Sequence, residues 1–352
     1  MEEGSEQFLE TLIETPSPSG FEESNLLNWR ERVEGQVDEL ETDAYGNTTA
    51  TLNPGCETSV VLTGHVDEIG FMVNHITDDG YIYLKKIGGV DLGVAQGQRV
   101  MVHGDGDVPG VIGRTPVHLQ ETEDEKQPEI DDIYVDVGAE DADDVRDMGI
   151  EVGDTATYDV GLQQLGNDVV AGRGLDNRIG VWVVAEALRQ IDGDELDVTV
   201  HGVATVQEEL GLRGAKMSSY SIDPDAALVV DVTFSTDVPK VSPEKHGVVE
   251  LGEGPSLKHG KENHPALVEG LEETADELEV DLQHEAILSH GATDADAFFV
   301  SRGGIPSVFV GVPNRNMHTP AELVSTSDLE DVRDLFTGYV ENLDSDVEYS
   351  KI

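Results

Sequence analysis

The chain has 352 residues, and its 73 acidic residues outnumber its 21 basic residues, which gives a formal net charge of −52. This charge argues against a protein that binds nucleic acid, because the phosphates would be repelled. The hydrophobic content is only 38%, but the apolar residues are concentrated in segments such as 181–188 and 226–232. The chain can therefore build a core and is not a disordered acidic polymer.

The acidic residues are distributed over every segment, with no run of five like charges, and only nine lysines are present. Such a composition is typical of proteins that stay hydrated in molar salt, where the screening length is about 3 Å and self-repulsion is tolerated. We therefore expect a halophile's protein. Because no 18-residue apolar window, no secretory signal and no cysteine besides Cys56 are seen, we expect it to be cytoplasmic, without a membrane span or an internal disulfide.

The first part of the chain begins with a predicted helix and strand and then changes character. Residues 5–14 have apolar positions at helical spacing, the segment 15–20 (TPSPSG) ends that helix, and 58–67 predicts a strand. From about 68 to 165, short apolar runs alternate with glycine and aspartate turns. Many short strands with turn signals predict a small β-rich module, either a barrel or a sandwich.

After residue 166, predicted strands alternate with predicted helices. The strands are at 197–206, 226–232 and 306–312, and the helices are at 177–191, 264–278 and 328–343. This alternation predicts an α/β fold with a mixed, mostly parallel sheet and helices on both of its faces. We therefore expect one α/β domain made of residues 1–67 and 166–352, interrupted by an inserted β-rich domain of residues 68–165.

The first candidate site is the pair His65 and Asp67 at the end of the predicted strand 58–67. In an extended chain, positions two apart point to the same side, so the imidazole and the carboxylate would stand together. Such a pair can hold a metal, with the carboxylate fixing the tautomer of the ring. Taken alone, it can equally be a polar strand end.

Four further acidic residues lie at or near the ends of predicted strands. Asp176 precedes a buried helix, where an N-cap is the ordinary explanation. Glu208 and Glu209 follow the strand 197–206, and most adjacent carboxylates are solvated surface charges. Asp231 ends a strand that is apolar on both faces, so it needs a partner, because an unpaired carboxylate away from water is costly.

His318 follows the predicted strand at 306–312 and precedes a predicted helix that starts near Pro320. A surface histidine is the ordinary explanation for that position as well. What favours a site is that all five places share one location, since the carboxyl ends of the strands meet along one edge of an open α/β sheet.

Two histidines and several carboxylates suit borderline divalent ions such as zinc, cobalt or manganese. Two dications, three ligand carboxylates and one hydroxide together would be neutral, which allows such a cluster to occupy a partly dry cleft. One carboxylate then remains to move protons. The set is suited to metal-assisted hydrolysis.

Seven segments, in order over nearly the whole chain, resemble the TET-type (tetrahedral, self-compartmentalising) dinuclear-metal aminopeptidases, a family that also contains glutamyl and deblocking aminopeptidases. They read TPSPSGFE, LTGHVDEIGFMV, GRGLDNRIGV, TVQEELGLRGA, VVDVT, GATDADAF and PNRNMHTPAE. Together with the composition, this resemblance indicates a halophilic archaeal member.

The resemblance implies two divalent metal ions per subunit. His65, Asp176 and Asp231 would hold one ion, and Asp176 would bridge to a second ion that Glu209 and His318 complete. Zinc is the expected metal, and cobalt and manganese suit the same ligands.

The resemblance also implies that Glu208 is the general base and that Asp67 orients His65. One departure is small: where paired glycines are expected before TDA, this chain reads SHGATDA at 289–295. The 111 positions that separate His65 from Asp176 hold the insertion where the TET-type family has its dimerisation domain. Related zinc carboxypeptidases and deacylases carry their extra domain after the fourth ligand instead.

The implied function is a metallo-aminopeptidase that removes N-terminal residues from peptides inside a hollow tetrahedral dodecamer built from dimers. A related carboxypeptidase or N-acyl amino acid deacylase is the alternative, and a non-catalytic scaffold fits the complete ligand set poorly. The preferred N-terminal residue depends on loops such as 252–260, whose shape the sequence does not specify.

Overall fold

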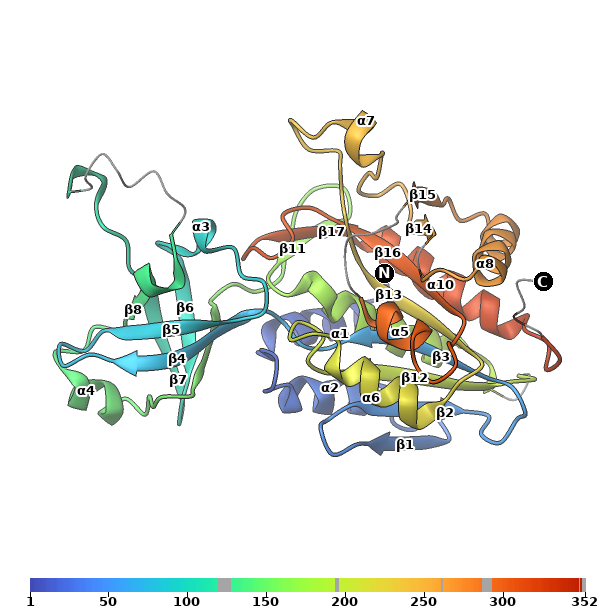
Figure 1. Cartoon of the computed structure of the whole chain (residues 1–352), viewed down its shortest axis with the longest axis horizontal. Coiled ribbons are helices and arrows are strands. Elements are labelled where there is room, and N and C mark those ends of the chain that lie inside the picture. Colours follow the sequence, from blue (N-terminus) through green and yellow to red (C-terminus); the bar gives the residue numbers. More distant parts are fainter. Residues whose placement is uncertain (120–127, 194–195, 261, 287–292, 348, 350–352) are drawn as a thin grey trace.

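A computed structural model describes residues 1–119, 128–193, 196–260, 262–286, 293–347 and 349 (Figure 1). Its strands form an eight-stranded mixed sheet, a closed six-stranded barrel and a small three-stranded sheet. Figure 1 shows the barrel standing to one side of the helix-covered sheet. Among the described residues, no helix combines the length and the apolar content that crossing a bilayer requires.

The N-terminal segment contributes two helices and three strands to the larger part of the molecule. These elements are α1 (Glu3–Glu14), α2 (Glu23–Val33), β1 (Glu39–Thr42), β2 (Thr48–Leu52) and β3 (Ser59–His65). The helix predicted at 5–14 is α1, and the strand predicted at 58–67 is β3, which ends at His65.

The barrel is formed by the segment between β3 and β11, with the strand order β4-β5-β8-β7-β6-β9. Its elements are β4 (Gly70–Ile76), β5 (Ile82–Ile87), α3 (Leu92–Ala95), β6 (Arg99–His103), β7 (Asp107–Ile112), β8 (Tyr134–Asp136), α4 (Ala142–Asp147) and β9 (Thr155–Tyr158). A separate apolar cluster, including Phe71, Ile82, Val100 and Val135, fills its interior. The prediction of a β-rich module is confirmed, and of the two architectures considered it is the barrel.

The remaining chain alternates between strands and helices, as predicted. The elements are β10 (Gln163–Gln164), β11 (Val169–Gly172), α5 (Leu175–Gln190), β12 (Thr199–Thr205), α6 (Arg213–Ile222), β13 (Ala226–Phe234), α7 (Pro243–His246), β14 (Ser256–His259), α8 (Pro265–Leu278), β15 (Gln283–Ala286), α9 (Asp294–Phe299), β16 (Ser307–Asn314), β17 (Glu322–Ser325) and α10 (Thr326–Glu341).

The large sheet has the order β1-β2-β12-β3-β13-β16-β14-β15, and its central strands β12, β3, β13 and β16 are parallel. Alternate residues of β3 enter different cores: Val60 and Leu62 pack with the cluster of α1, α2, α5, α8 and α10, whereas Val61 packs with residues of α6 and α9. Because both faces of the central strands are buried, their sequences are continuous apolar runs. The predicted mostly parallel α/β sheet with helices on both faces is confirmed.

One predicted helix is wrong. The sequence after His318 was expected to enter a helix near Pro320, but it forms β17, and the next helix, α10, begins at Thr326. The backbone of Leu323 exchanges two hydrogen bonds with Arg315, and β17 pairs antiparallel with β11. This pairing with residues distant in sequence outweighs the helix-starting signal of the proline.

Candidate metal centre

The register of the central strands places His65, Asp231 and the start of the loop that carries the two glutamates at one level of the sheet. Thr205, the last residue of β12, lies opposite His65, the last residue of β3, and Glu208 and Glu209 follow Thr205 in the next loop. On the other side, Val229 of β13 pairs with Thr63, so Asp231 is level with His65. Asp231 is therefore not at the end of its strand, as the sequence suggested, but within β13, beyond its pairing with β3.

The ring of His65 is the meeting point of three carboxylates. Its Nε2 atom lies 3.4 Å from Asp176 Oδ1, 3.8 Å from Glu208 Oε2 and 3.8 Å from Asp231 Oδ1. His65 itself is buried. One atom of each of His65, Glu208 and Asp231 lies within 4.8 Å of the others, a spacing that suits ligands of a single metal ion.

Asp176 contacts both histidines of the site. While its Oδ1 faces His65, its Oδ2 lies 3.2 Å from His318 Nε2. The side chain of Glu209 completes this second group, with Oε1 3.5 Å from His318 Nε2. Two neighbouring groups of ligands thus share one carboxylate, which is the arrangement expected for a bridging ligand.

Asp176 reaches this position by a route that the sequence did not indicate. It follows β11, which belongs to the three-stranded sheet and not to the large one, and it lies in the first turn of α5 with non-helical backbone angles. The N-cap of α5 is Gly174, so the helix-capping explanation does not apply to Asp176. The peptide bond to Asn177 is cis, and the Asn177 amide donates to the carbonyl of Val230 in β13.

Asp67 lies beneath the site and contacts three of its parts. His65 Nδ1 is 3.1 Å from the backbone carbonyl of Asp67 and 3.4 Å from its Oδ1. The same carboxylate accepts hydrogen bonds from the backbone N–H groups of Glu208 and Glu209 and from Ser19 Oγ. Asp67 is therefore placed to fix the ring of His65, and it also holds the loop that carries the two glutamates.

Glu322, a buried residue at the start of β17, was not predicted from the sequence. Its carboxylate accepts hydrogen bonds from the backbone N–H groups of Asp176 and His318, so it joins the two segments that form the second group. The only sequence signal was an acidic residue next to an apolar strand, in the segment where a helix was expected. The wrong helix prediction therefore concealed it.

The barrel also reaches the site, through the two glycines that follow β5. His318 Nδ1 lies 3.1 Å from the carbonyl oxygen of Gly89. A Cβ atom at Gly89 would lie 2.7 Å from His318 Nδ1, and one at Gly88 would lie 2.9 Å from Glu209 Oε2. Side chains at these positions would collide with the site, and Gly88 also has a positive φ of 71°, which glycine adopts readily. No sequence motif pointed to this contact.

The carboxylates of the site are crowded and buried, and this changes their acidity. Burial, with the neighbouring carboxylates of Asp176 and Asp294, raises the pKa of Asp231 to about 8. Burial, together with Asp231, raises the pKa of Glu208 to about 10, and burial with Asp176 raises the pKa of Glu209 to about 7. Each shift means that the negative form lacks sufficient positive charge nearby.

Histidine is the partner in every ion pair that these carboxylates form within the described part of the chain, through either His65 or His318. The site thus combines an excess of buried carboxylates with two imidazoles, which are the donors that zinc and similar dications prefer. Dications would supply the missing charge and lower the pKa of each carboxylate. The residues present therefore fit a pair of divalent ions.

A second acidic group lies directly beside the site but has a different character. Glu68 is buried, and its carboxylate accepts hydrogen bonds at 2.6 Å from Arg173 Nη1 and at 2.5 Å from Arg178 Nη2. Its other donor is the backbone N–H of Ser17. Burial alone would raise the pKa of Glu68, but the charges of the two arginines hold it below its usual value.

Six of the predicted site residues are thus brought together in two adjacent groups, and the seventh, Asp67, lies beside His65. Glu208 and Asp231 both lie 3.8 Å from His65 Nε2, so these distances do not distinguish a metal ligand from a general base. The assignment of Glu208 as the general base therefore stays a prediction. The substituted segment SHGA at 289–292 lies outside the described residues. The following Asp294 is buried, and its Oδ2 accepts a hydrogen bond from Thr205 at the end of β12.

Comparison with known proteins agrees with this geometry. The sequence profile of the M42 glutamyl aminopeptidases matches residues 46–335. The lysyl aminopeptidase of Pyrococcus furiosus is 33% identical over 345 residues, which cover 96% of this chain and 97% of the relative. The crystal structure of a TET aminopeptidase from the marine sediment archaeon Thaumarchaeota archaeon SCGC AB-539-E09 matches with a TM-score of 0.92 at 34% identity, over 97% of both chains.

A third similar protein is the TET1 peptidase of Pyrococcus horikoshii, which can assemble into a tetrahedron or a large octahedral shell. Its structure matches with a TM-score of 0.86 at 29% identity and covers 96% of this chain and 100% of the other. The chain belongs to the M42 glutamyl aminopeptidase family. It is accordingly an aminopeptidase, and its structure is similar to those of TET aminopeptidases.

Proposed function

We propose that this aminopeptidase uses two divalent metal ions, held by His65, Asp176, Asp231, Glu209 and His318, with Glu208 as general base. The observation that carries the proposal is the position of Asp176, whose two carboxylate oxygens face His65 and His318 separately. A carboxylate shared in this way suits a two-ion site better than two unrelated ion pairs.

When bound, the two ions would lower the pKa of a water molecule and polarise the carbonyl group of the scissile peptide bond. The protein's own part is to position and to transfer protons. Glu208 would take a proton from the attacking water and deliver it to the amine of the leaving peptide. Asp67 would keep His65 in one orientation, and Glu322 would hold the backbones of Asp176 and His318 in place.

Zinc is the metal we propose, because imidazole and carboxylate donors in small numbers suit it, and cobalt and manganese accept the same ligands. The products would be a free N-terminal amino acid and a peptide shortened by one residue. The side chain that is preferred depends on loops around the site, and a panel of N-terminal aminoacyl reporters assayed with each metal would identify it.

The test compares peptides with a free N-terminus and peptides with an acetylated N-terminus, in molar KCl with added Zn²⁺. We expect cleavage of the free peptides only, and we expect Glu208→Gln to lower turnover by roughly 10²- to 10⁴-fold while two ions per chain are retained. Glu209→Gln is the matched control, because it should lose metal as well as activity. Near-normal turnover of Glu208→Gln would remove Glu208 from its role, and cleavage of acetylated substrates would favour a deacylase or carboxypeptidase.

We further propose that residues 68–165 form an inserted dimerisation domain within a catalytic domain of residues 1–67 and 166–352, and that dimers assemble into a tetrahedral dodecamer. The support is the separate core of the barrel and the tetrahedral assembly of the similar TET1 peptidase. The acidic composition supports a halophilic, archaeal and cytoplasmic protein. The figure of twelve subunits follows the resemblance described above.

Sedimentation in decreasing salt tests the assembly and the halophilic character together. We expect a dodecamer in molar KCl and dissociation at low salt, because at 0.01 M acidic surfaces repel each other over a screening length of about 30 Å. Monomers at every salt concentration would contradict the assembly. A dodecamer unaffected by desalting would contradict the halophilic character.

A further inference from the structure

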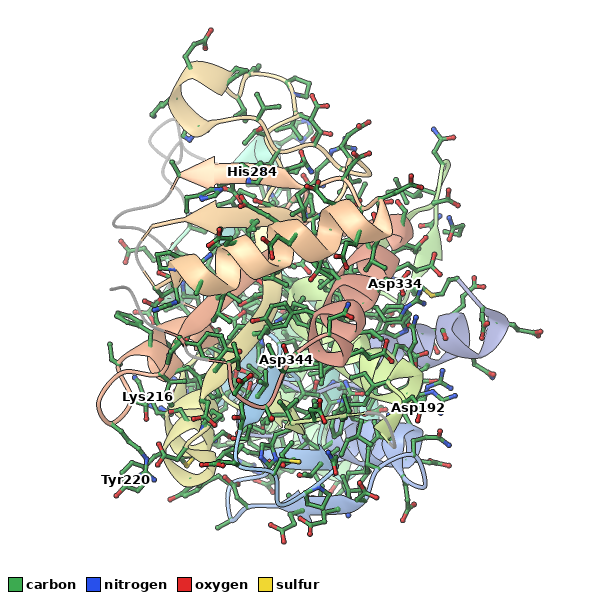
Figure 2. The ribbon with its side chains drawn as sticks, turned by 90° about the vertical axis from the view of Figure 1, so that its right-hand side faces the viewer. Asp192, Lys216, Tyr220, His284, Asp334 and Asp344 are labelled. Atoms are coloured by element: carbon green, nitrogen blue, oxygen red, sulfur yellow. The ribbon has the colours of Figure 1, made fainter. Side chains whose placement is uncertain are left out.

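A third group of possible metal ligands lies outside the candidate metal centre. It consists of His259 at the end of β14, His284 on β15 and Glu272 on α8. In the large sheet, β15 is the last strand, and β14 and β16 separate it from β13. Figure 2 shows His284 on this edge strand, near the surface of the molecule.

The fold brings these three side chains together for a simple geometric reason. β14 and β15 are parallel, with Leu257 opposite His284 and His259 opposite Ala286, so both histidines project from the same face of the sheet. Leu257 on that face is buried in the large core, together with Leu271 of α8. The packing of α8 over this face places Glu272, the next residue, at the rim beside the two rings.

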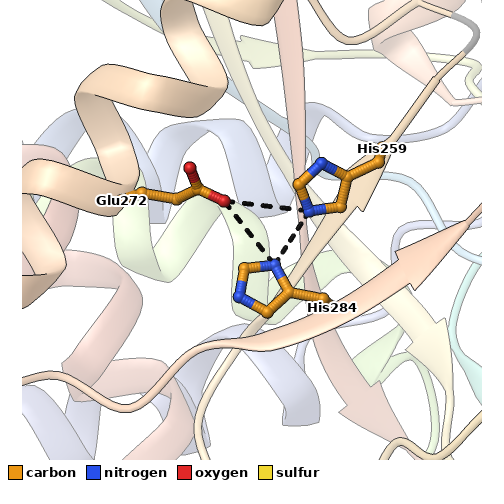
Figure 3. A group of neighbouring side chains, drawn as sticks. All are labelled: His259, Glu272 and His284. Carbon is orange, nitrogen blue, oxygen red and sulfur yellow. Dashed lines mark hydrogen bonds and ion pairs between the residues drawn. The ribbon is translucent and has the colours of Figure 1, made fainter.

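The three side chains point toward one another (Figure 3). His259 Nε2 lies 2.9 Å from His284 Nδ1, and Glu272 Oε1 lies 3.8 Å from each of these two nitrogens. The exposed fractions of the three side chains are 46%, 49% and 42% for His259, His284 and Glu272, so the group is open to ions from solution.

We propose that His259, Glu272 and His284 form a third metal site, separate from the catalytic centre, that binds one Zn²⁺ or similar transition-metal ion. Two imidazoles with one carboxylate form a donor set found at zinc sites with an open position, where water completes the coordination. With ligand bonds of about 2.0 to 2.2 Å, the ligand atoms of a tetrahedral ion are about 3.3 to 3.6 Å apart. One of the three distances in this group is shorter than this range and two are longer, so small side-chain rotations would bring all three atoms to the spacing of metal ligands.

A metal explains the geometry better than ion pairing does. Two protonated imidazoles at 2.9 Å would repel each other, whereas a pair in which at least one ring is neutral can share only one hydrogen bond. In either case the carboxylate of Glu272 remains 3.8 Å from both nitrogens, which is too long for a hydrogen bond. A cation between the three atoms would satisfy the carboxylate and both nitrogen lone pairs at once.

The expected role of this site is structural. β15 is a strand of four residues at the edge of the sheet, paired only with β14 among the described residues. A metal held by β14, β15 and α8 would fasten this edge strand to the sheet and to the helix that covers it. Because no ligand is shared with the catalytic centre, failure of this proposal would leave the proposed function unaffected, and the converse also holds.

The test measures Zn²⁺ binding and stability of the full-length protein in molar KCl. The protein is first freed of metal with a chelator, then dialysed and titrated with ZnCl₂ while heat and bound zinc per chain are recorded. His284→Gln and Glu272→Gln are compared with the native chain and with His246→Gln, a control at an exposed histidine of α7 that belongs to none of the three groups. Peptidase activity is measured in parallel.

We expect the native chain and His246→Gln to bind three Zn²⁺ ions per chain. His284→Gln and Glu272→Gln should bind two, or bind the third at least about 10-fold more weakly, with unchanged peptidase activity. Zn²⁺ should also raise the unfolding temperature less in these two variants than in the control. Equal stoichiometry in all four proteins, or a loss of stability that is the same with and without zinc, would overturn the proposal in favour of simple ion pairing.

Discussion

Two groups of buried acids lie side by side in this protein, and they differ in how their charge is balanced. Asp67 and Glu68 are adjacent in the sequence and both are buried. Glu68 meets the guanidinium groups of Arg173 and Arg178. Asp67 faces the other group, whose carboxylates have His65 and His318 as their ion-pair partners.

The difference appears in the acidity of the two groups. The arginines hold the pKa of Glu68 below its usual value, whereas burial among other carboxylates raises the pKa of Asp231 to about 8. The chain thus supplies the countercharge for one group and leaves the other in need of external cations. The contrast distinguishes a structural ion cluster from a site built for a ligand.

The largest effect is expected from Glu68→Gln, which leaves two buried arginines without their carboxylate. Removing one partner of a buried ion pair costs about 3 to 5 kcal/mol of the free energy of unfolding. The pKa of Glu68 is lowered, so its contribution is complete above the unfolded value of 4.5 and is lost as the pH falls through the folded value. Calorimetric unfolding of both proteins should therefore show a full difference at pH 7 that narrows below pH 4.5.

The exposed Glu10 on α1 provides a control, since Glu10→Gln should change stability little. If Glu68→Gln unfolded like this control at pH 7, the arginine cluster would not have the structural role that its contacts indicate.

An intermediate effect is expected from chelating the metals. The pKa values of Asp231 and Glu209 are raised to about 8 and about 7 in the folded protein. The stability that their protonated forms contribute is therefore complete below the unfolded pKa values near 4. It is lost as the pH rises through the folded pKa values of about 7 to 8. Chelated protein should therefore lose on the order of 3 kcal/mol between pH 5 and pH 8. Protein with excess Zn²⁺ should not, because metal binding requires the ionised ligands and strengthens with pH.

Unfolding temperatures of chelated and zinc-loaded protein at pH 5, 6.5 and 8 would measure this divergence. Parallel curves would mean that the acids of the centre are neutralised without metal, and the contrast with the arginine cluster would disappear.

The smallest effect is expected from Asp67→Asn, which keeps the backbone carbonyl near His65 but removes the negative charge beneath the site. Groups that support metal ligands typically contribute 10- to 100-fold in metal affinity or activity. Zinc titration and kcat/KM should both decrease within that range, and some stability should be lost, because the amide nitrogen of the asparagine would face a backbone N–H that now donates to the carboxylate. Ser19→Ala, which removes one donor to the same carboxylate, serves as the milder comparison. An equal loss of zinc affinity and kcat/KM in both variants would assign the effect to packing and not to the charge of Asp67.

The sequence was sufficient to predict the mixed sheet, a small β-rich module and the proximity of the seven candidate site residues, whose roles stay predictions. Continuous apolar runs predict strands that are buried on both faces, and His65, Glu208 and His318 lie at or just after the ends of such runs. The position of Asp231 within its strand was less predictable. β13 continues to Phe234, although its pairing with β3 ends at Val229, and in the sequence the acidic residue alone appeared to mark the end of the strand.

Contacts between distant segments were not predictable from the sequence. Glu322 acts through backbone N–H groups that are four and 146 positions away. The strand β17 forms because β11 pairs with it, against the local preference for a helix after Pro320. The group of His259, Glu272 and His284 likewise depends on the register of two strands and on the packing of a helix, and none of its members belongs to a recognisable motif.

The glycine pair after β5 links the inserted barrel to the chemistry of the site. Because Gly88 and Gly89 lie against Glu209 and His318, a loop of the barrel forms part of the surroundings of the candidate metal centre. Exchanging this module with that of another peptidase would therefore change the surroundings of the candidate metal centre, unless both glycines and the path of their loop were kept. Under the dimerisation role that we propose for the barrel, the surroundings of the metal centre and the contacts between subunits could not be engineered independently of each other.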